Sequence, residues 1–196
     1  MRIKSLSTIS LWIVCLVLLM SVSCVFSPKS GKKEDPVPPK TQIPLTTQIV
    51  IENLQAAFNL RDAELYEKTL HEDFYYQYTP EYDDHSVIWT RTEEIEAIRN
   101  MFAQTKDFVL TPSLISIQEE YGQNMKDIPP GAAIDSDDEH PDEKWIICNY
   151  YITMDIFLSD LGDFKVQQDM KFKMVEDPVT HYYSIIRWVD DALITE

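Results

Sequence analysis

Apolar side chains recur at helical spacing in the first part of the domain and at strand spacing after it. Residues 46–60 carry an apolar stripe near the helical period, which predicts an amphipathic helix. Residues 63–70 form a shorter helical pattern behind Asp62, a good N-cap. A third helix is expected after Thr90, because Thr90 and Glu93 can satisfy each other's free backbone donors in a capping box.

Strand-like alternation dominates the chain after the third helix, and one aromatic strand is expected before it. The predicted strands span residues 74–78, 108–117, 144–159, 164–176 and 182–190. Asp160 and Asp163 are expected to close a tight hairpin between two of them, with Gly162 supplying a positive φ. Helices first and strands last predict an α+β domain, in which about three helices pack on one face of an antiparallel sheet.

The N-terminal residues follow neither pattern and indicate a targeting segment. Arg2 and Lys4 precede an apolar run at residues 11–20, and small residues then lead to Cys24. This layout predicts a signal peptide over residues 1–23. The apolar run is shorter than the roughly 20 residues that a spanning helix needs. Ordinary secretion and an uncleaved membrane anchor stay open as alternatives.

A cysteine directly after small residues resembles the lipobox of bacterial lipoproteins, although Ser21 stands where that family usually places an aliphatic residue. The resemblance implies that Cys24 becomes the N-terminus and carries palmitate-type acyl chains. Two or more such chains hold a protein stably on a bilayer. The protein is therefore expected at the bacterial cell envelope, in the outer membrane where the organism has one. Its domain is expected outside the cytoplasm, with the membrane as its partner through Cys24.

Composition divides the remaining chain into a tether and one acidic domain. Residues 24–44 hold five prolines and four lysines, and such a segment is expected to be extended. Residues 45–196 are the expected domain. They carry 11 Lys and Arg against 31 Asp and Glu, a net charge of −20. A surface of that charge repels nucleic acid, which excludes a nucleic-acid partner.

The sequence predicts no cofactor and no metal site. Cys148 lies in an apolar strand of the domain and is expected to be a small buried hydrophobe. Neither His71 nor His85 gives a metal constellation by itself. Residues 135–139, Asp-Ser-Asp-Asp-Glu, lack the glycine and the glutamate of an EF-hand loop. They are expected to form a mobile, solvated acidic loop.

Several segments resemble the NTF2-like superfamily, which includes ketosteroid isomerase and the SnoaL-type polyketide cyclases. They are residues 52–62 with Tyr66, residues 71–74 and, near the C-terminus, residues 183–191. The resemblance covers about residues 45–196 and implies a curved antiparallel sheet wrapped around the helices, a cone with a pocket at its open end. That superfamily contains enzymes, ligand binders and interaction domains, so the fold alone does not select a function.

The expected hairpin register brings candidate site residues together. It puts Asp155 opposite Gln168, on a strand face that is otherwise apolar. A similar turn before the last strand puts Arg187 one step from Asp155, and a slip of one residue would replace Arg187 by a neighbour. Tyr76 or Tyr78 is expected to add a phenol.

These residues allow two interpretations. A carboxylate in an apolar pocket has a raised pKa, so Asp155 with a tyrosine would suit an isomerase, dehydratase or cyclase. Pairing of Asp155 with Arg187 would instead lower that pKa and leave a satisfied buried network. The second interpretation is favoured, and with it a non-enzymatic domain that binds a small apolar ligand or a protein partner. The candidate ligand-binding residues are Tyr76, Tyr78, Asp155, Gln168 and Arg187.

The second long strand, residues 144–159, is apolar on both faces. A strand of that kind needs cover on both sides, and the helices supply one side only. NTF2-like domains often dimerise through the outer face of their sheet. A homodimer or another partner is therefore expected to cover the outer sheet face.

Overall fold

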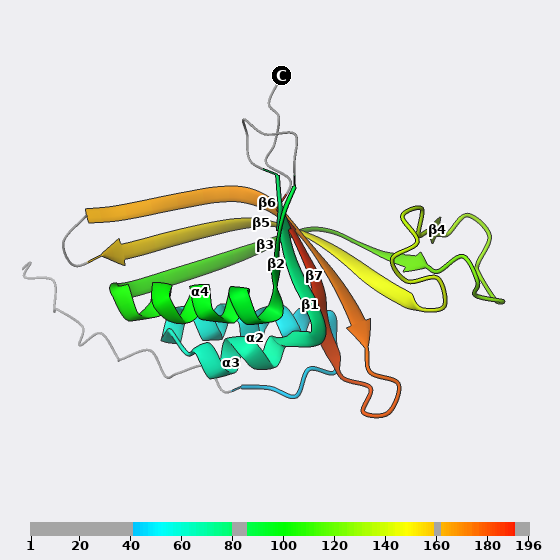
Figure 1. Ribbon diagram of the computed structural model, residues 1–196, viewed down its shortest axis with the longest axis horizontal. Coiled ribbons are helices and arrows are strands. Elements are labelled where there is room, and N and C mark those ends of the chain that lie inside the picture. Colours follow the sequence, from blue (N-terminus) through cyan, green and yellow to red (C-terminus); the bar gives the residue numbers. More distant parts are fainter. Residues whose placement is uncertain (1–40, 80–85, 159–161, 191–196) are drawn as a thin grey trace, which may run out of the picture. The chain divides into compact units, whose positions relative to one another are not determined.

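The computed structural model of the protein describes residues 41–79, 86–158 and 162–190, and in these ranges three helices lie on one face of a seven-stranded sheet (Figure 1). The expected signal peptide, Cys24, nearly all of the tether and the turn at residues 160–161 lie outside the described residues. Within those ranges, no helix is both long enough and apolar enough to cross a membrane.

The helices begin where their capping residues predict. They are α2 (Thr47–Leu60), α3 (Ala63–Thr69) and α4 (Arg91–Gln104). Thr46 and Asp62 accept hydrogen bonds from N–H groups in the first turns of α2 and α3. Thr90 and Glu93 form the expected capping box of α4. The predicted start of each of these three helices is confirmed.

The sheet has the strand order β2-β1-β7-β6-β5-β3-β4. Its strands are β1 (Leu70–Tyr78), β2 (Val87–Thr90), β3 (Thr105–Tyr121), β4 (Ala133–Ile134), β5 (Lys144–Leu158), β6 (Gly162–Glu176) and β7 (Tyr183–Asp190). The series β3-β5-β6-β7 is antiparallel, as expected, but β1 pairs with β7 in parallel, so the sheet is mixed. The sequence pattern does not show β2 and β4, because strands of four and two residues are too short for alternation.

One core fills the space between the helices and the sheet. The ring of Phe58 on α2 packs edge-on against those of Tyr66 and Phe102, at centroid distances of 5.5 and 5.3 Å. The even-numbered residues of β5 from Ile146 to Ile156 face this core, and Cys148 among them is fully buried. The expectation that Cys148 is a buried hydrophobe is confirmed, and burial raises the pKa of its thiol.

The register of β5 and β6 differs from the expected one by three residues. Asp155 lies opposite Lys165, and Gln168 lies opposite Ile152. Because side chains alternate along a strand, an odd shift reverses the face on which a residue lies. The predicted pair of Asp155 and Gln168 is therefore wrong. Gln168 lies on the core face and Asp155 on the outer face.

Arg187 also lies on the outer face of the sheet. It pairs with Lys173 and not beside Met170, because the register of β6 and β7 is shifted and carries an irregularity. Trp188 enters the core in its place. The predicted proximity of Arg187 to Asp155 is wrong for the same reason.

The segment of residues 122–142 covers one end of the outer face. A small apolar cluster is buried there, formed by Trp145, Ile147, Val175 and Ile186. The ring of His140 stacks on Trp145 with centroids 4.1 Å apart. Asp135 is only 1% exposed and Glu139 pairs with Lys173, so the prediction of a solvated loop is wrong for these two residues, whereas Ser136, Asp137 and Asp138 are exposed. At this end of β5, the helices cover one face and the segment of residues 122–142 covers the other.

Backbone contacts close the base of this segment. The N–H of Gly122 donates to the Glu143 carbonyl at 2.8 Å, and that of Asn124 to the Pro141 carbonyl at 2.7 Å. A Cβ on Gly122 would lie 2.1 Å from the carbonyl oxygen of His140, so only glycine fits here. The close approach of the two backbones holds His140 in place beside the sheet.

Candidate functional site

A cavity of about 380 Å³ opens between the core face of the sheet and the helices α2 and α4. Its apolar lining consists of Phe58, Trp89, Ala97, Ile98, Met101, Met154, Met170 and Trp188. The remaining lining residues are Tyr76, Tyr78, Glu94 and Gln168. A cleft of this size, with apolar walls and few polar groups, is typical of a site for a small organic ligand.

Aromatic rings form one wall of the cavity. Tyr76 stacks on Tyr78 with ring centroids 5.8 Å apart and an interplanar angle of 24°. The ring of Tyr76 also meets those of Trp89 and Trp188, each at a centroid distance of 5.8 Å. The rings converge because β1 lies between β2 and β7 in the sheet. A flat apolar molecule can lie against this wall.

Asp190, at the end of β7, joins two of the predicted residues. Its Oδ2 accepts hydrogen bonds from the Tyr76 hydroxyl at 3.1 Å and from Nε2 of Gln168 at 2.9 Å. Burial, together with the Asp190 carboxylate, raises the pKa of Tyr76 well above its ordinary value, so the phenol stays protonated. Asp190 is not itself a lining residue, but it orients the two lining side chains Tyr76 and Gln168.

Glu94 on α4 is a buried carboxyl that sequence reasoning missed. It is 5% exposed, and its Oε1 accepts a hydrogen bond of 2.6 Å from the Tyr66 hydroxyl. Desolvation raises the pKa of Glu94 and outweighs the lowering by the Tyr66 hydrogen bond. The signal for it was its spacing, because Glu94, Ile98 and Met101 follow one another at four and three residues along one helix face.

The structure brings only some of the five candidate residues to the cavity. They are Tyr76, Tyr78 and Gln168. Asp155 lies on the outer face, with its Oδ1 3.7 Å from Nζ of Lys165. The guanidinium of Arg187 lies over the ring of Tyr75, 3.8 Å from its centroid, on that same face. Asp155 and Arg187 therefore do not meet in the cavity, and the ligand-binding role of the other three stays a prediction.

We expect Glu94→Gln to remove a pH dependence of stability. The pKa of Glu94 is raised on folding, so the folded state holds this proton more tightly than the unfolded chain. The stability that this brings is lost as pH rises from the unfolded pKa of about 4.3 through the folded pKa, at about 1.4 kcal/mol per pKa unit. Glutamine stays uncharged and still accepts from Tyr66, so the variant should be the more stable protein near neutral pH.

Urea unfolding at a series of pH values measures this effect. Glu96→Gln, at an exposed position of the same helix, is the matched control and should follow the wild-type profile. If the free energy of unfolding of Glu94→Gln falls with rising pH as steeply as that of the wild type, the pH dependence does not come from Glu94.

No protein-family model matches the chain, and no curated protein matches it. Solved structures do match. A conserved protein from Planctomyces limnophilus DSM 3776 has a TM-score of 0.54 at 7% identity, covering 74% of this chain and 91% of its own. A provisionally named scytalone dehydratase from Novosphingobium aromaticivorans DSM 12444 has a TM-score of 0.52 at 8% identity, covering 72% and 78%.

A provisionally named aromatic ring hydroxylase from Novosphingobium aromaticivorans has a TM-score of 0.52 at 14% identity, covering 78% of this chain and 90% of its own. At such identities a likeness shows the fold and not the chemistry. The arrangement of this chain agrees with that fold, because its helices lie on one face of a long sheet with a cavity between helices and sheet. The described domain is an α+β cone of the NTF2-like fold.

Proposed function

We propose that the domain binds a small, mostly apolar ligand in the cavity, and that acyl chains on Cys24 hold the protein in a membrane of the bacterial cell envelope. The observation that carries the first part is a cavity of about 380 Å³ walled by aromatic rings and methionines. Burying a ligand there gains about 25 cal/mol per Å² of apolar surface. The second part rests on the layout of residues 1–24.

The polar groups of the cavity suggest which molecules fit. Gln168 and Asp190 form one polar group beside Tyr76. The Tyr76 hydroxyl and the Gln168 amide both donate to the Asp190 carboxylate, so the remaining oxygen lone pairs of the group are acceptors. Glu94 presents a second polar group on α4. A ring-containing molecule with a hydroxyl or amine at one end would pack its body on the aromatic wall and donate to the side-chain oxygen of Gln168 or Glu94, which line the cavity.

Acid–base catalysis is the second candidate function, because Glu94 is a carboxyl in a cavity with a raised pKa. A carboxyl that keeps its proton toward neutral pH can act as a general acid. Asp155 does not serve this role, since it lies on the outer face. The provisional name of one structural neighbour is that of a dehydratase.

A homodimer through the outer sheet face also stays a proposal. Residues 122–142 already cover the end of that face near Trp145. The part left for a second copy lies farther along β3, β5 and β6, where Val109 and Tyr151 are both 39% exposed. A dimer there would bury these side chains together with the polar groups between them.

Ligand binding is tested by filling the cavity. We expect Ala97→Phe to weaken binding of the neutral fluorescent probe N-phenyl-1-naphthylamine by about tenfold or more, because the new ring occupies the volume that the probe needs. Fluorescence titration of the full-length protein in detergent measures the affinity. Ala103→Phe, at an exposed position of α4, is the matched control and should bind the probe like the wild type. Equal binding by the two variants would place the probe elsewhere.

Binding and catalysis are separated by the molecule that co-purifies with the protein. Mass spectrometry of ligands extracted from the wild type and from Glu94→Gln should detect the same molecule if the domain only binds it. Catalysis predicts substrate in the variant and product in the wild type, which differ by a molecule of water or in retention time. The second outcome would replace the binding proposal with an enzyme.

Anchoring is tested at Cys24. We expect Cys24→Ser to abolish metabolic labelling with palmitate and to release the protein from the membrane fraction, because the only proposed acylation site is lost. Cys148→Ala is the control, since that thiol is fully buried in the described domain. Retention of label and of membrane association in Cys24→Ser would show that the N-terminal segment acts as an uncleaved anchor or that another site is acylated.

A further inference from the structure

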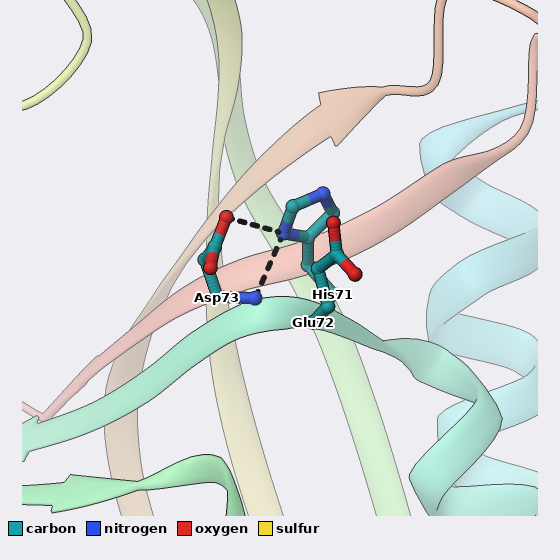
Figure 2. A group of neighbouring side chains, drawn as sticks. All are labelled: His71, Glu72 and Asp73. Atoms are coloured by element: carbon teal, nitrogen blue, oxygen red, sulfur yellow. Dashed lines mark hydrogen bonds and ion pairs between the residues drawn. The ribbon is translucent and has the colours of Figure 1, made fainter.

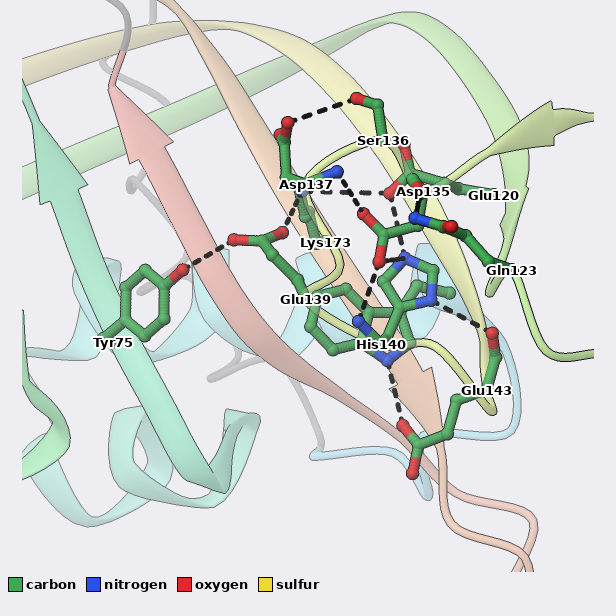
Figure 3. A network of polar contacts seen from close by, with 11 residues as sticks. Tyr75, Glu120, Gln123, Asp135, Ser136, Asp137, Glu139, His140, Glu143 and Lys173 are labelled. Atoms are coloured by element: carbon green, nitrogen blue, oxygen red, sulfur yellow. Dashed lines mark hydrogen bonds and ion pairs between the residues drawn. The ribbon is translucent and has the colours of Figure 1, made fainter.

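On the face opposite the cavity, three side chains of metal-ligand type lie together. They are Glu120 at the end of β3, Asp135 just after β4, and His140 before β5 (Figure 3). Their nearest ligand atoms all lie within 4.8 Å of one another. The side chains of His140 and Asp135 are 1% and 2% exposed, and that of Glu120 is 18% exposed. This burial distinguishes the group from a solvated acidic surface.

The hydrogen bonds of His140 determine where its proton lies. Its Nδ1 is 3.0 Å from the backbone carbonyl oxygen of Glu143, which can only accept, so Nδ1 carries a proton. In the neutral ring the lone pair is then on Nε2. That atom lies 3.0 Å from Oε1 of Glu120 and 4.0 Å from Oδ2 of Asp135. With the ring neutral, three acceptors face one another in a nearly dry site, and a positive charge between them would stabilise that arrangement.

We propose that Glu120, Asp135 and His140 bind a divalent transition-metal ion, for which Zn²⁺ is the best match. One imidazole nitrogen and two carboxylate oxygens are a zinc-type donor set, with a fourth position left for water. A metal-binding histidine usually donates its other ring N–H to a carbonyl or carboxylate, as His140 does to Glu143.

The Asp135 carboxylate is also oriented as a ligand requires. Its Oδ1 accepts the N–H of Asp137 at 3.1 Å, and its Oδ2 accepts the N–H of His140 at 2.8 Å. Backbone donors of this kind fix a carboxylate and leave lone pairs on both oxygens for a cation. The site is therefore pre-arranged by the chain before any ion binds.

The charges around the site leave room for a cation. Lys173 lies 3.8 Å from Oε1 of Glu120, but its closest ion pair is with Glu139, which also accepts from the Tyr75 hydroxyl at 2.7 Å. Lys173 can stay with Glu139 while Glu120 turns to the metal. A second cation described near this group is Arg187, whose guanidinium stacks on the ring of Tyr75. Among these described residues, the carboxylates of Glu120, Asp135 and Glu139 outnumber the cations Lys173 and Arg187, so a further positive charge is favourable.

A metal ion here would act on the structure of the outer face. Its three ligands come from the end of β3, the middle of the 122–142 segment and the turn before β5. One ion would therefore tie the segment to the sheet above Trp145, on which the ring of His140 stacks. Binding would stabilise the folded protein, because the unfolded chain does not bring these ligands together.

A second group of neighbouring ligand-type residues provides an internal control. His71, Glu72 and Asp73 are consecutive on β1 (Figure 2). The Nδ1 lone pair of His71 already accepts the N–H of Asp73 at 3.1 Å, and the Asp73 side chain is largely exposed. In this group no buried acceptor atoms face one another, so it is not proposed as a metal site.

The experiment uses full-length protein in detergent, stripped with a chelator and titrated with ZnCl₂ near neutral pH in a calorimeter. We expect one Zn²⁺ to bind per chain and to raise the melting temperature. Loss of a group that only hydrogen-bonds to a metal ligand costs about 10- to 100-fold in affinity, so loss of the ligand itself in His140→Gln should weaken binding by about 100-fold or more. His71→Gln should bind like the wild type. Equal Zn²⁺ binding by the wild type and His140→Gln, or none by either, would overturn the proposal.

Two further measurements keep the test decisive if His140→Gln fails to fold. Glu120→Gln removes the most exposed ligand, so the domain should fold while Zn²⁺ affinity falls. The visible spectrum of Co²⁺ bound to the wild type should report nitrogen and oxygen coordination and disappear in Glu120→Gln. The rival source of positive charge is a second proton on His140. An NMR signal from a doubly protonated His140 that Zn²⁺ leaves unchanged would overturn the metal site.

Discussion

The pairing of β5 with β6 is the constraint on which both faces of the sheet depend. Neighbouring residues of a strand point to opposite faces, so this register directs Met154 and Gln168 to the cavity and Trp145 and Lys173 to the outer face. A slip of one residue would bring lysines into the apolar core and expose the residues that line the cavity. The cavity on one side and the charged network on the other thus follow from a single register.

The two faces satisfy their buried carboxyls in different ways. Glu94 lines the cavity and Asp190 is bonded to two lining residues, Tyr76 and Gln168. Each carboxyl accepts from a phenol, and no lysine or arginine is among the described lining residues. A buried phenol with a raised pKa remains a neutral donor, so the carboxyl beside it gains a hydrogen bond without a neighbouring positive charge. This keeps the cavity apolar in character while it retains two polar groups.

On the outer face the carboxylates are matched by cations and by backbone donors. The Lys173 ammonium, together with the Tyr75 hydroxyl, outweighs desolvation and holds the pKa of Glu139 below its usual range. The N–H groups of His140 and Asp137 do the same for the carboxyl of Asp135. This network fastens a segment with little regular secondary structure to the sheet, where it covers Trp145. A long connection is thus attached to the sheet by specific polar contacts and not by apolar packing alone.

Local patterns in the sequence determined the helices, the long strands and the α+β class, because caps and periodicity depend on neighbouring residues. Thr46, Asp62 and the box of Thr90 with Glu93 are examples. Sequence alone also selected Tyr76 as a cavity candidate. It did not determine the register of the strands, which depends on turn geometry and long-range pairing. Only the tertiary structure shows that Asp155 lies on the outer face, that Glu94 lines the cavity and that His140 lies beside two carboxylates. Each of these positions depends on contacts between segments far apart in the chain.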